Sequence, residues 1–251
     1  MEQGKNNAAY RVRNLLVAAK NSQDSLKTVD VWKMALANSN DPVESFEVIR
    51  LIELLRSELR SIERILAKQG VPKQTYSPHF QSAYQATAVE NVNATWSNFR
   101  GNITNELLVC LQFSEFIIKE DEPEFAVEQI EKITQLIQEL RSSLEDPDLD
   151  PELTYFVSQQ ISLLERGLRD LKIRGSKAIQ KCYVDGLGEI LEHSDILQDN
   201  ADTPIVNKLK AAWGHVQSAT EKAAQLNKSV DTWGRLLERG ADVVDQFAQL
   251  A

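Results

Sequence analysis

DLDPELTYFVSQQISLLERGLRDLKIRGSKAIQKC, the stretch from Asp148 to Cys182, carries the clearest helix signals in the chain. Asp150 can accept hydrogen bonds from the free amides of a first helical turn, and Pro151 is tolerated at the first helical position. Apolar residues then recur every three or four positions, at Leu153, Val157, Ile161, Leu164, Leu168 and Leu171. This spacing places them on one face of a helix, and we expect that face to be buried.

The opposite face of this helix and the turn after it are strongly basic. Gly175 and Ser176 predict a stop and a restart, with the glycine at the helix end and the serine capping the next helix. Against only Glu165 and Asp170, this face and the turn carry Arg166, Arg169, Lys172, Arg174, Lys177 and Lys181. We therefore treat these six cations as a candidate interaction surface.

The same stretch also carries a family resemblance. Its pattern P-E-L-x-x-F-V-x-x-Q-I-x-x-L-x-x-G-L-x-x-L-x-I-R-G runs from Pro151 to Gly175. This pattern resembles a segment of uncharacterised bacterial all-helical proteins that have no assigned activity. The resemblance implies a bacterial, helical protein, and it transfers no functional residue.

Other segments repeat the helical spacing. Val48, Ile52, Leu55, Leu59, Ile62 and Leu66 alternate steps of four and three, which suits lengthwise packing in a bundle. We predict a loop over residues 69–80, a break near Gly101 and a polar loop over residues 194–202. The first predicted helix spans residues 8–37, with an interruption at 21–25. The other predicted helices span residues 42–68, 81–119, 124–144, 151–174, 176–193 and 205–250.

These segments predict an all-α fold, an elongated antiparallel helical bundle with a long C-terminal amphipathic helix. We divide the chain into a bundle over residues 1–200 and a C-terminal helix over residues 201–251, which packs on the bundle or on a partner. Residues 205–250 allow two interpretations, one continuous helix or a hairpin that turns at residues 227–229. The continuous helix is favoured, because the three-and-four spacing persists with a single phase slip.

Charge and composition bound the compartment. The formal charge is −9 with a pI of about 5.0, and the segment from Lys119 to Glu152 alone sums to −9. No window approaches the ~18 apolar residues of a spanning helix, and the N-terminus lacks the apolar core of a signal peptide. Cys110 and Cys182 lie within apolar patterns, as expected of buried thiols in a reducing compartment. We expect a cytoplasmic protein.

Candidate catalytic and metal sites are weak. The acids from Asp146 to Glu152 resemble a calcium loop, but Pro151 stands where the turn requires glycine, and helix capping explains them. Asp185, Glu189 and His193 share one helical face, yet their pattern matches no zinc motif and is typical of a solvated face. The sequence has no phosphate loop, nucleophile elbow or catalytic triad. We expect no enzymatic activity, no cofactor and no metal.

Two basic rows remain, the cations named above and a second row at Arg56, Arg60, Arg64 and Lys68. Basic rows can bind phosphates, but these lack interleaved exposed aromatic residues, and acids neighbour the second row. A solvated face, or contact with the acidic helix of the same protein, is favoured over nucleic acid.

Two tryptophans of the C-terminal helix complete the candidate surface. Trp213 and Trp233 are 20 residues apart, about 30 Å along a helix, which matches the thickness of a bilayer core. Charges between them exclude an isolated spanning helix, although an oligomer could still insert. Both tryptophans also fit the apolar stripe of a protein core.

Two functional hypotheses follow. The first is a non-enzymatic interaction or regulatory protein that binds another protein or itself as a homo-oligomer. The second is a membrane-perturbing effector, similar to pore-forming proteins, that acts through the C-terminal helix.

Overall fold

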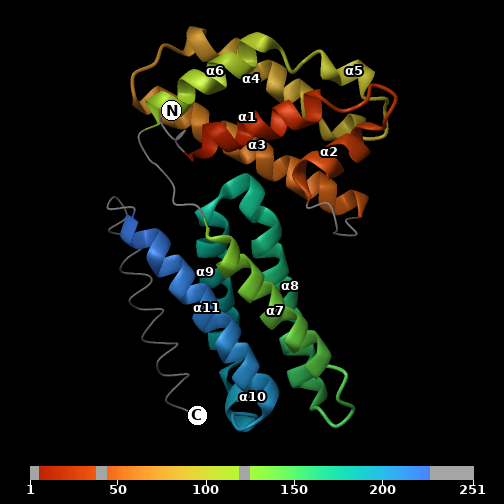
Figure 1. Cartoon of the computed structure of the whole chain (residues 1–251), viewed down its shortest axis with the longest axis vertical. Coiled ribbons are helices and arrows are strands. Elements are labelled where there is room, and N and C mark those ends of the chain that lie inside the picture. Colours follow the sequence, from red (N-terminus) through yellow and green to blue (C-terminus); the bar gives the residue numbers. More distant parts are fainter. Residues whose placement is uncertain (1–5, 38–43, 119–124, 227–251) are drawn as a thin grey trace. The chain divides into compact units, whose positions relative to one another are not determined.

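The structure is a computed structural model that describes residues 6–37, 44–118 and 125–226. Within these ranges every regular element is a helix, so the all-α prediction is confirmed (Figure 1). The chain forms two compact units: unit 1 contains Met1–Glu122 with Lys172–Gly175, and unit 2 contains Pro123–Leu171 with Ser176–Ala251. The predicted division at residue 200 therefore differs from the observed one, because the C-terminal helix shares a core with four helices before it.

Unit 1 contains six helices and a single 3-10 turn within its described residues. They are α1 Ala8–Lys20, α2 Thr28–Leu36, α3 Ser45–Lys68, α4 Lys73–Ala86, the turn Val89–Asn91, α5 Ser97–Arg100 and α6 Asn105–Ile117. The predicted interruption at residues 21–25 is confirmed, since α1 ends at Lys20. The chain after this break is fixed by backbone hydrogen bonds to a distant segment, from Thr28 N to Ala94 O and from Trp96 N to Leu26 O.

One predicted loop is wrong, because α4 occupies most of residues 69–80. Pro78 lies inside this helix, where it removes one backbone donor. Tyr76, Phe80 and Ala83 are all buried at helical spacing, and their burial offsets the lost hydrogen bond. The predicted helix over 81–119 is instead broken: α4 ends at Ala86 and α6 begins at Asn105. The expected break near Gly101 is confirmed.

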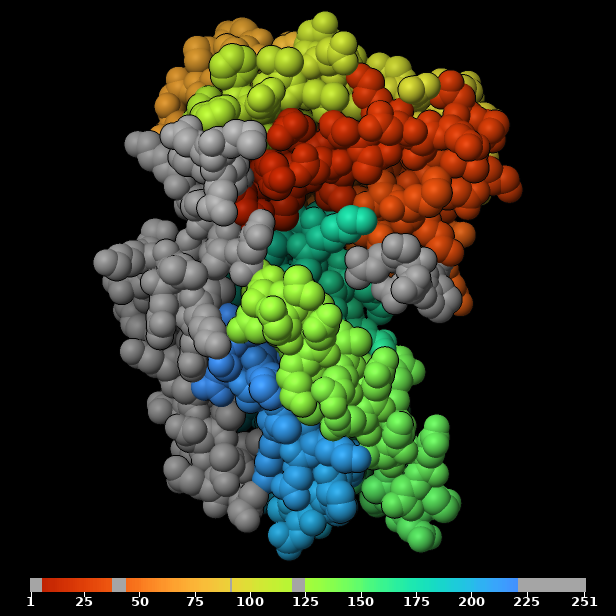
Figure 2. Space-filling view, viewed as in Figure 1, coloured from red at the N-terminus to blue at the C-terminus, as the bar shows by residue number. Residues whose placement is uncertain are grey.

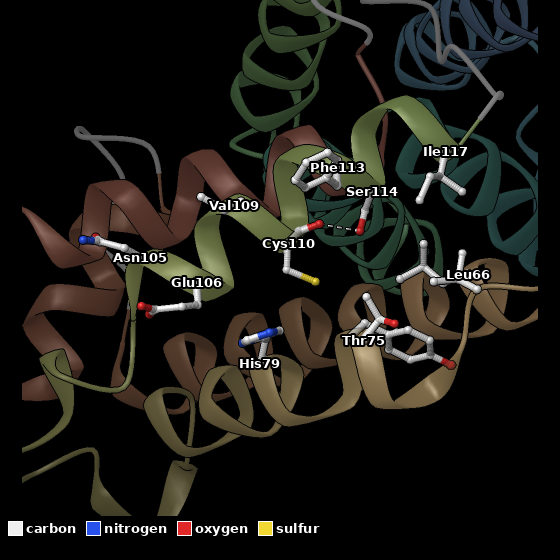
Figure 3. Close-up of a pocket in the computed structure, with 12 residues that line it drawn as sticks. Leu66, Thr75, His79, Asn105, Glu106, Val109, Cys110, Phe113, Ser114 and Ile117 are labelled. Atoms are coloured by element: carbon white, nitrogen blue, oxygen red, sulfur yellow. Dashed lines mark hydrogen bonds between the residues drawn. The ribbon is translucent and has the colours of Figure 1, made fainter.

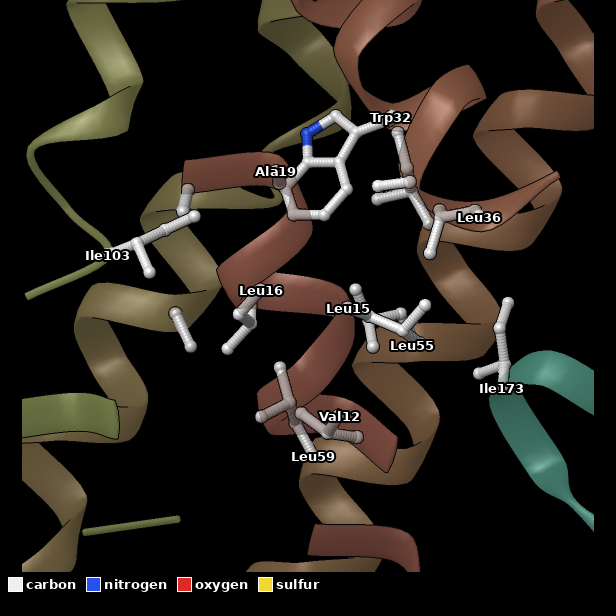
Figure 4. Packing of buried hydrophobic residues seen from close by; sticks show 14 of the residues in the cluster. Val12, Leu15, Leu16, Ala19, Trp32, Leu36, Leu55, Leu59, Ile103 and Ile173 are labelled. Carbon is white, nitrogen blue, oxygen red and sulfur yellow. The ribbon is translucent and has the colours of Figure 1, made fainter. Parts of the chain in front are cut away.

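The core of unit 1 is formed where α1, α2 and α3 meet (Figure 4). Trp32 and Trp96 are fully buried in it, with their rings edge to face at 5.7 Å between centroids. This geometry is favourable for two aromatic rings. Other members are Val12, Leu16, Leu36, Leu55, Leu59, Ile103 and, from the segment Lys172–Gly175, Ile173.

Unit 2 is a helical bundle in which α7 and α8 are antiparallel neighbours (Figure 1). Their short connection and the ion pair from Arg141 to Glu165, at 2.6 Å, agree with the sequence prediction. The segment predicted as a polar loop at residues 194–202 instead contains the short α10. The helices are α7 Val127–Ser143, α8 Pro151–Arg174, α9 Ser176–Glu192, α10 Ser194–Asp199 and α11 Pro204–Leu226.

The α8 helix begins as its sequence predicts. Asp150 Oδ1 accepts hydrogen bonds from the amides of Glu152 and Leu153, both at 2.9 Å. The helix ends before Gly175, whose φ of 60° lies in the left-handed region that favours glycine. Asp150 therefore caps α8, as the sequence predicts, and Asp146 Oδ1 accepts from Asp148 N within the loop at 3.0 Å.

The α11 helix packs against α7 and α9 and contributes to the core of unit 2. Its start at Pro204 is confirmed, and its 23 residues span about 35 Å. Residues 227–251 lie outside the described part of the chain, and so does the choice between a continuous helix and a hairpin.

Candidate functional site: an apolar trough between α4 and α6

The α6 helix is apolar on two sides. Leu107 and Leu111 are buried on the side that packs against α1. On its outer side Val109, Phe113 and Phe116 are 49%, 66% and 67% exposed. These three residues are spaced i, i+4 and i+7, so they form one stripe on the helix. In Figure 2 the yellow-green segment that contains α6 lies at the surface of unit 1, beside the red atoms of α1.

The inner side of α6 is fixed by polar contacts. Asn7 Nδ2 donates to Glu115 O at 2.9 Å, and the Arg13 guanidinium pairs with the Glu115 carboxylate. Thr104 caps the helix, since its hydroxyl oxygen accepts from Leu107 N at 3.1 Å. Because one side is anchored in this way, the outer stripe cannot turn inward, and it stays exposed.

Beside this stripe lies a trough of about 580 Å³ between α6, α4 and the end of α3 (Figure 3). In the close-up Glu106 and Asn105 lie at one end of the trough, and Ile117 and Leu66 lie at the other. The thiol of Cys110 points from α6 towards α4, and His79 points from α4 towards α6. The remaining lining residues are Val71, Thr75, Tyr76, Val109, Phe113 and Ser114.

The electrostatics of the trough are simple. Of the lining residues that the structure describes, Glu106 is the only aspartate, glutamate, lysine or arginine, and His79 lies on the opposite wall. Its own backbone N–H and the Thr104 hydroxyl donate hydrogen bonds that lower the pKa of this exposed carboxyl. Burial raises the pKa of the Cys110 thiol, which is therefore protonated at neutral pH. Ser114 donates its hydroxyl to Cys110 O at 2.8 Å.

Neither the Cys110 thiol nor the Ser114 hydroxyl is arranged as an activated nucleophile. A nucleophilic cysteine needs a lowered pKa, and Cys110 has a raised one. The Ser114 hydroxyl donates to a carbonyl of its own helix instead of to a base. A trough of this volume with mostly apolar walls and a few polar groups is typical of a binding site.

The six cations that the sequence marks as a candidate surface are divided between the two units. Lys172 and Arg174 belong to unit 1, where Lys172 donates to Ala37 O at 3.2 Å and Arg174 pairs with Glu58 at 3.7 Å. Burial lowers the pKa of Lys172, although its side chain remains partly exposed. Lys181 pairs with Asp185 at 2.8 Å on the same helix.

The other predicted cations lie in unit 2. Arg169 and Lys177 are half-buried on α8 and α9. Arg166 is exposed and lines a smaller hollow of about 380 Å³, together with Tyr155, Glu189 and His193. The second basic row, on α3, is partly paired: Arg56 contacts Glu53 at 3.2 Å and donates to Thr87 O at 3.0 Å.

Of the two candidate tryptophans, the structure describes Trp213. Trp213 is only 2% exposed, its indole N–H donates to Gln160 Oε1 at 3.1 Å, and its ring lies against Gly186. It is a core residue, since its apolar ring and its polar N–H are both satisfied inside unit 2. Trp233 lies outside the described residues.

The possible metal ligands Asp185, Glu189 and His193 do not converge. Asp185 pairs with Lys181, and His193 Nδ1, just past the end of α9, lies 3.0 Å from Glu189 O. The ligand atoms of Glu189, Glu192 and His193 do lie within 4.8 Å of one another. Since Glu189 and Glu192 are exposed at a helix end, this grouping is also what a solvated face produces.

The trough itself was not predicted. The loop predicted over residues 69–80 covers most of its α4 wall, so the sequence does not place a second helix opposite α6. The signal that could have found it is the spacing of Val109, Phe113 and Phe116 on a helix whose other side is already apolar.

Comparisons of the chain with protein-family models, curated proteins and solved structures find no match. The resemblance of Pro151–Gly175 to bacterial helical proteins therefore stays a prediction. Fold and site together define an all-α protein of two units with an open apolar trough in unit 1.

Proposed function

We propose that this is a non-enzymatic interaction protein that binds another protein, or a second copy of itself, through the α4–α6 trough. The observation that carries the proposal is the exposed stripe of Val109, Phe113 and Phe116 beside an apolar trough. The apolar side of a helix is normally buried against another element, and here one of the two apolar sides of α6 is left exposed. Burying one such side chain contributes about 1.5–3 kcal/mol, and aromatic residues dominate the centres of protein interfaces.

The proposal is tested by replacing Phe113 with serine. Phe46→Ser is the matched control, because Phe46 is 68% exposed on α3 of the same unit and does not line the trough. We expect Phe113→Ser to abolish self-association in light scattering, or to lose a partner captured by the wild type, while Phe46→Ser retains it. Circular dichroism confirms that both variants fold. A strictly monomeric wild type whose captured partners are the same as those of Phe113→Ser would overturn the proposal.

The membrane-perturbing alternative has less support. None of the helices in the described part of the chain is long and apolar enough to cross a membrane. Action through Trp213 would require α11 to leave its core and to break the hydrogen bond with Gln160. Leakage from liposomes of acidic and neutral lipids tests this alternative directly, and we expect none.

A further inference from the structure

We infer that the occupant of the trough is an amphipathic helix of a partner protein, about three turns long, with a lysine or arginine at the end beside Glu106. This inference rests on the proposed function and specifies the chemistry of the partner. It is carried by three properties of unit 1: the length of the trough, the extent of the apolar surface around it and the position of Glu106.

The length of the trough matches a short helix. Its lining residues on α6 run from Asn105 to Ile117, which corresponds to about 18 Å along the helix axis at 1.5 Å per residue. A partner helix of about three turns covers the same distance. It presents three or four apolar side chains on one face, spaced i, i+4 and i+7.

The apolar surface is wider than the trough. Phe113 lies on the rim, and Phe116 is 67% exposed although it does not line the trough. A single alkyl chain lying in the trough would leave Phe116 in water. A helix is about 10 Å wide with its side chains, so it can fill the trough with one row of residues and cover Phe116 with the next.

The charge fixes the polarity of the partner. Glu106 lies at one end of the trough, and hydrogen bonds from its own backbone N–H and from the Thr104 hydroxyl lower the pKa of its carboxyl (Figure 3). His79 and Lys20 lower the same pKa by less, and the Lys20 ammonium is held beside it by a hydrogen bond to Asn105 Oδ1 at 2.8 Å. The other end, at Ile117 and Leu66, is apolar. A cation on the partner is therefore favoured at the Glu106 end, and an acid there is disfavoured. Because Glu106 is exposed, this pair sets orientation more than affinity.

The test uses full-length protein and fluorescently labelled synthetic peptides of about 15 residues, a length that spans the trough as a helix. The first peptide has leucines at i, i+4, i+7 and i+11 and a lysine at one end. The second has glutamate in place of the lysine, and the third has the same composition with the leucines shuffled. Fluorescence anisotropy gives each dissociation constant for wild type, Phe113→Ser, Phe116→Ser, Glu106→Gln and the control Phe46→Ser.

We expect the lysine peptide to bind a few-fold more tightly than the glutamate peptide, and the shuffled peptide to bind weakly. Phe113→Ser and Phe116→Ser should each weaken binding about tenfold or more, and Phe46→Ser should not change it. Glu106→Gln should abolish the preference for lysine and leave the affinity for the glutamate peptide no weaker than in the wild type. Added salt should reduce the same preference.

Dodecylamine is the competing probe, since it has a cationic head and an alkyl chain of comparable length. Two results together would identify a single-chain amphiphile and overturn the inference. In the first, dodecylamine displaces the peptide from the wild type. In the second, Phe116→Ser changes the affinity for neither dodecylamine nor the peptide. Equal binding of the lysine and glutamate peptides would overturn the assigned polarity. If no peptide binds while Phe113→Ser still abolishes association of the wild type, the helical occupant is wrong and the proposed function stands.

Discussion

At position 186 of α9, any side chain would collide with Trp213. A Cβ built on Gly186 would lie 2.1 Å from the Cη2 atom of the indole ring, far inside van der Waals contact. Gly167 shows a similar approach between α8 and α9, since its Cβ would lie 2.8 Å from Cys182 Sγ. Because these two positions have no side chain, the indole of Trp213 can pack directly against α9, and the side chain of Cys182 can pack directly against α8.

This contact predicts opposite effects for two glycines of one helix. Gly186→Ala should lower the free energy of unfolding by about 1–3 kcal/mol, because the indole must move in a packed core. Gly188→Ala should raise it by up to about 1 kcal/mol, because alanine favours the helix and no described heavy atom lies within 4 Å of the new Cβ. Urea unfolding followed by circular dichroism measures both. Equal destabilisation by the two substitutions would show that the packing against Trp213 is not tight.

At the scale of single elements, the sequence predicted those features that depend on neighbouring residues. The start of α8 is an example, because Asp150 and Pro151 satisfy the requirements of a first helical turn without help from the rest of the chain. The start of α4 was missed for the opposite reason. Pro72 and Pro78 are local signals for a loop, and only the tertiary burial of Tyr76 and Phe80 overrides them.

The α8 cap leads to a matched pair of substitutions. Asp150→Ala should lower the free energy of unfolding by about 1 kcal/mol, since it removes the acceptor of two amide hydrogen bonds. Asp148→Ala removes the same charge from an exposed position two residues earlier and should change stability by less than about 0.5 kcal/mol. Thermal denaturation of the two variants compares them directly. A loss from Asp148→Ala as large as that from Asp150→Ala would assign the effect to charge instead of capping.

The candidate site could be predicted only in part for the same reason. The exposed stripe on α6 is visible in the sequence, because its spacing is local. The trough needs α4 as its second wall, and α4 depends on tertiary packing. The sequence also does not reveal the partners of three basic residues. Lys172 donates to a backbone carbonyl, and Arg174 and Lys181 each pair with a carboxylate of the same protein.

At the scale of the whole chain, two separate cores replace the single bundle expected from length and spacing. Each core has its own buried tryptophans, Trp32 and Trp96 in unit 1 and Trp213 in unit 2. The segment Lys172–Gly175 belongs to unit 1, although it contains the end of α8, whose earlier residues belong to unit 2 as α9 does. Periodicity alone could not reveal this division, because apolar stripes of the same spacing supply both cores.

Two cores predict two unfolding transitions. Two variants, both carrying Trp233→Phe, separate the fluorescence of the units. In the first, Trp213 is also replaced by phenylalanine, so the fluorescence of Trp32 and Trp96 reports unit 1. In the second, Trp32 and Trp96 are replaced by phenylalanine, so the fluorescence of Trp213 reports unit 2. Adding Gly186→Ala should shift the transition of unit 2 to lower urea concentration and leave that of unit 1 in place. Coincident shifts of both transitions would show that the two units unfold as one cooperative body.

The outward side of α6 also has a consequence for handling the protein. Sulfate and phosphate salts are excluded from protein surfaces and strengthen the burial of apolar groups. A stripe with two exposed phenylalanines should therefore associate more strongly with other apolar surfaces in ammonium sulfate than at low ionic strength. Crystals grown from such salts would place neighbouring copies against α6, whereas polyethylene glycol at low ionic strength would leave it open to soaked molecules.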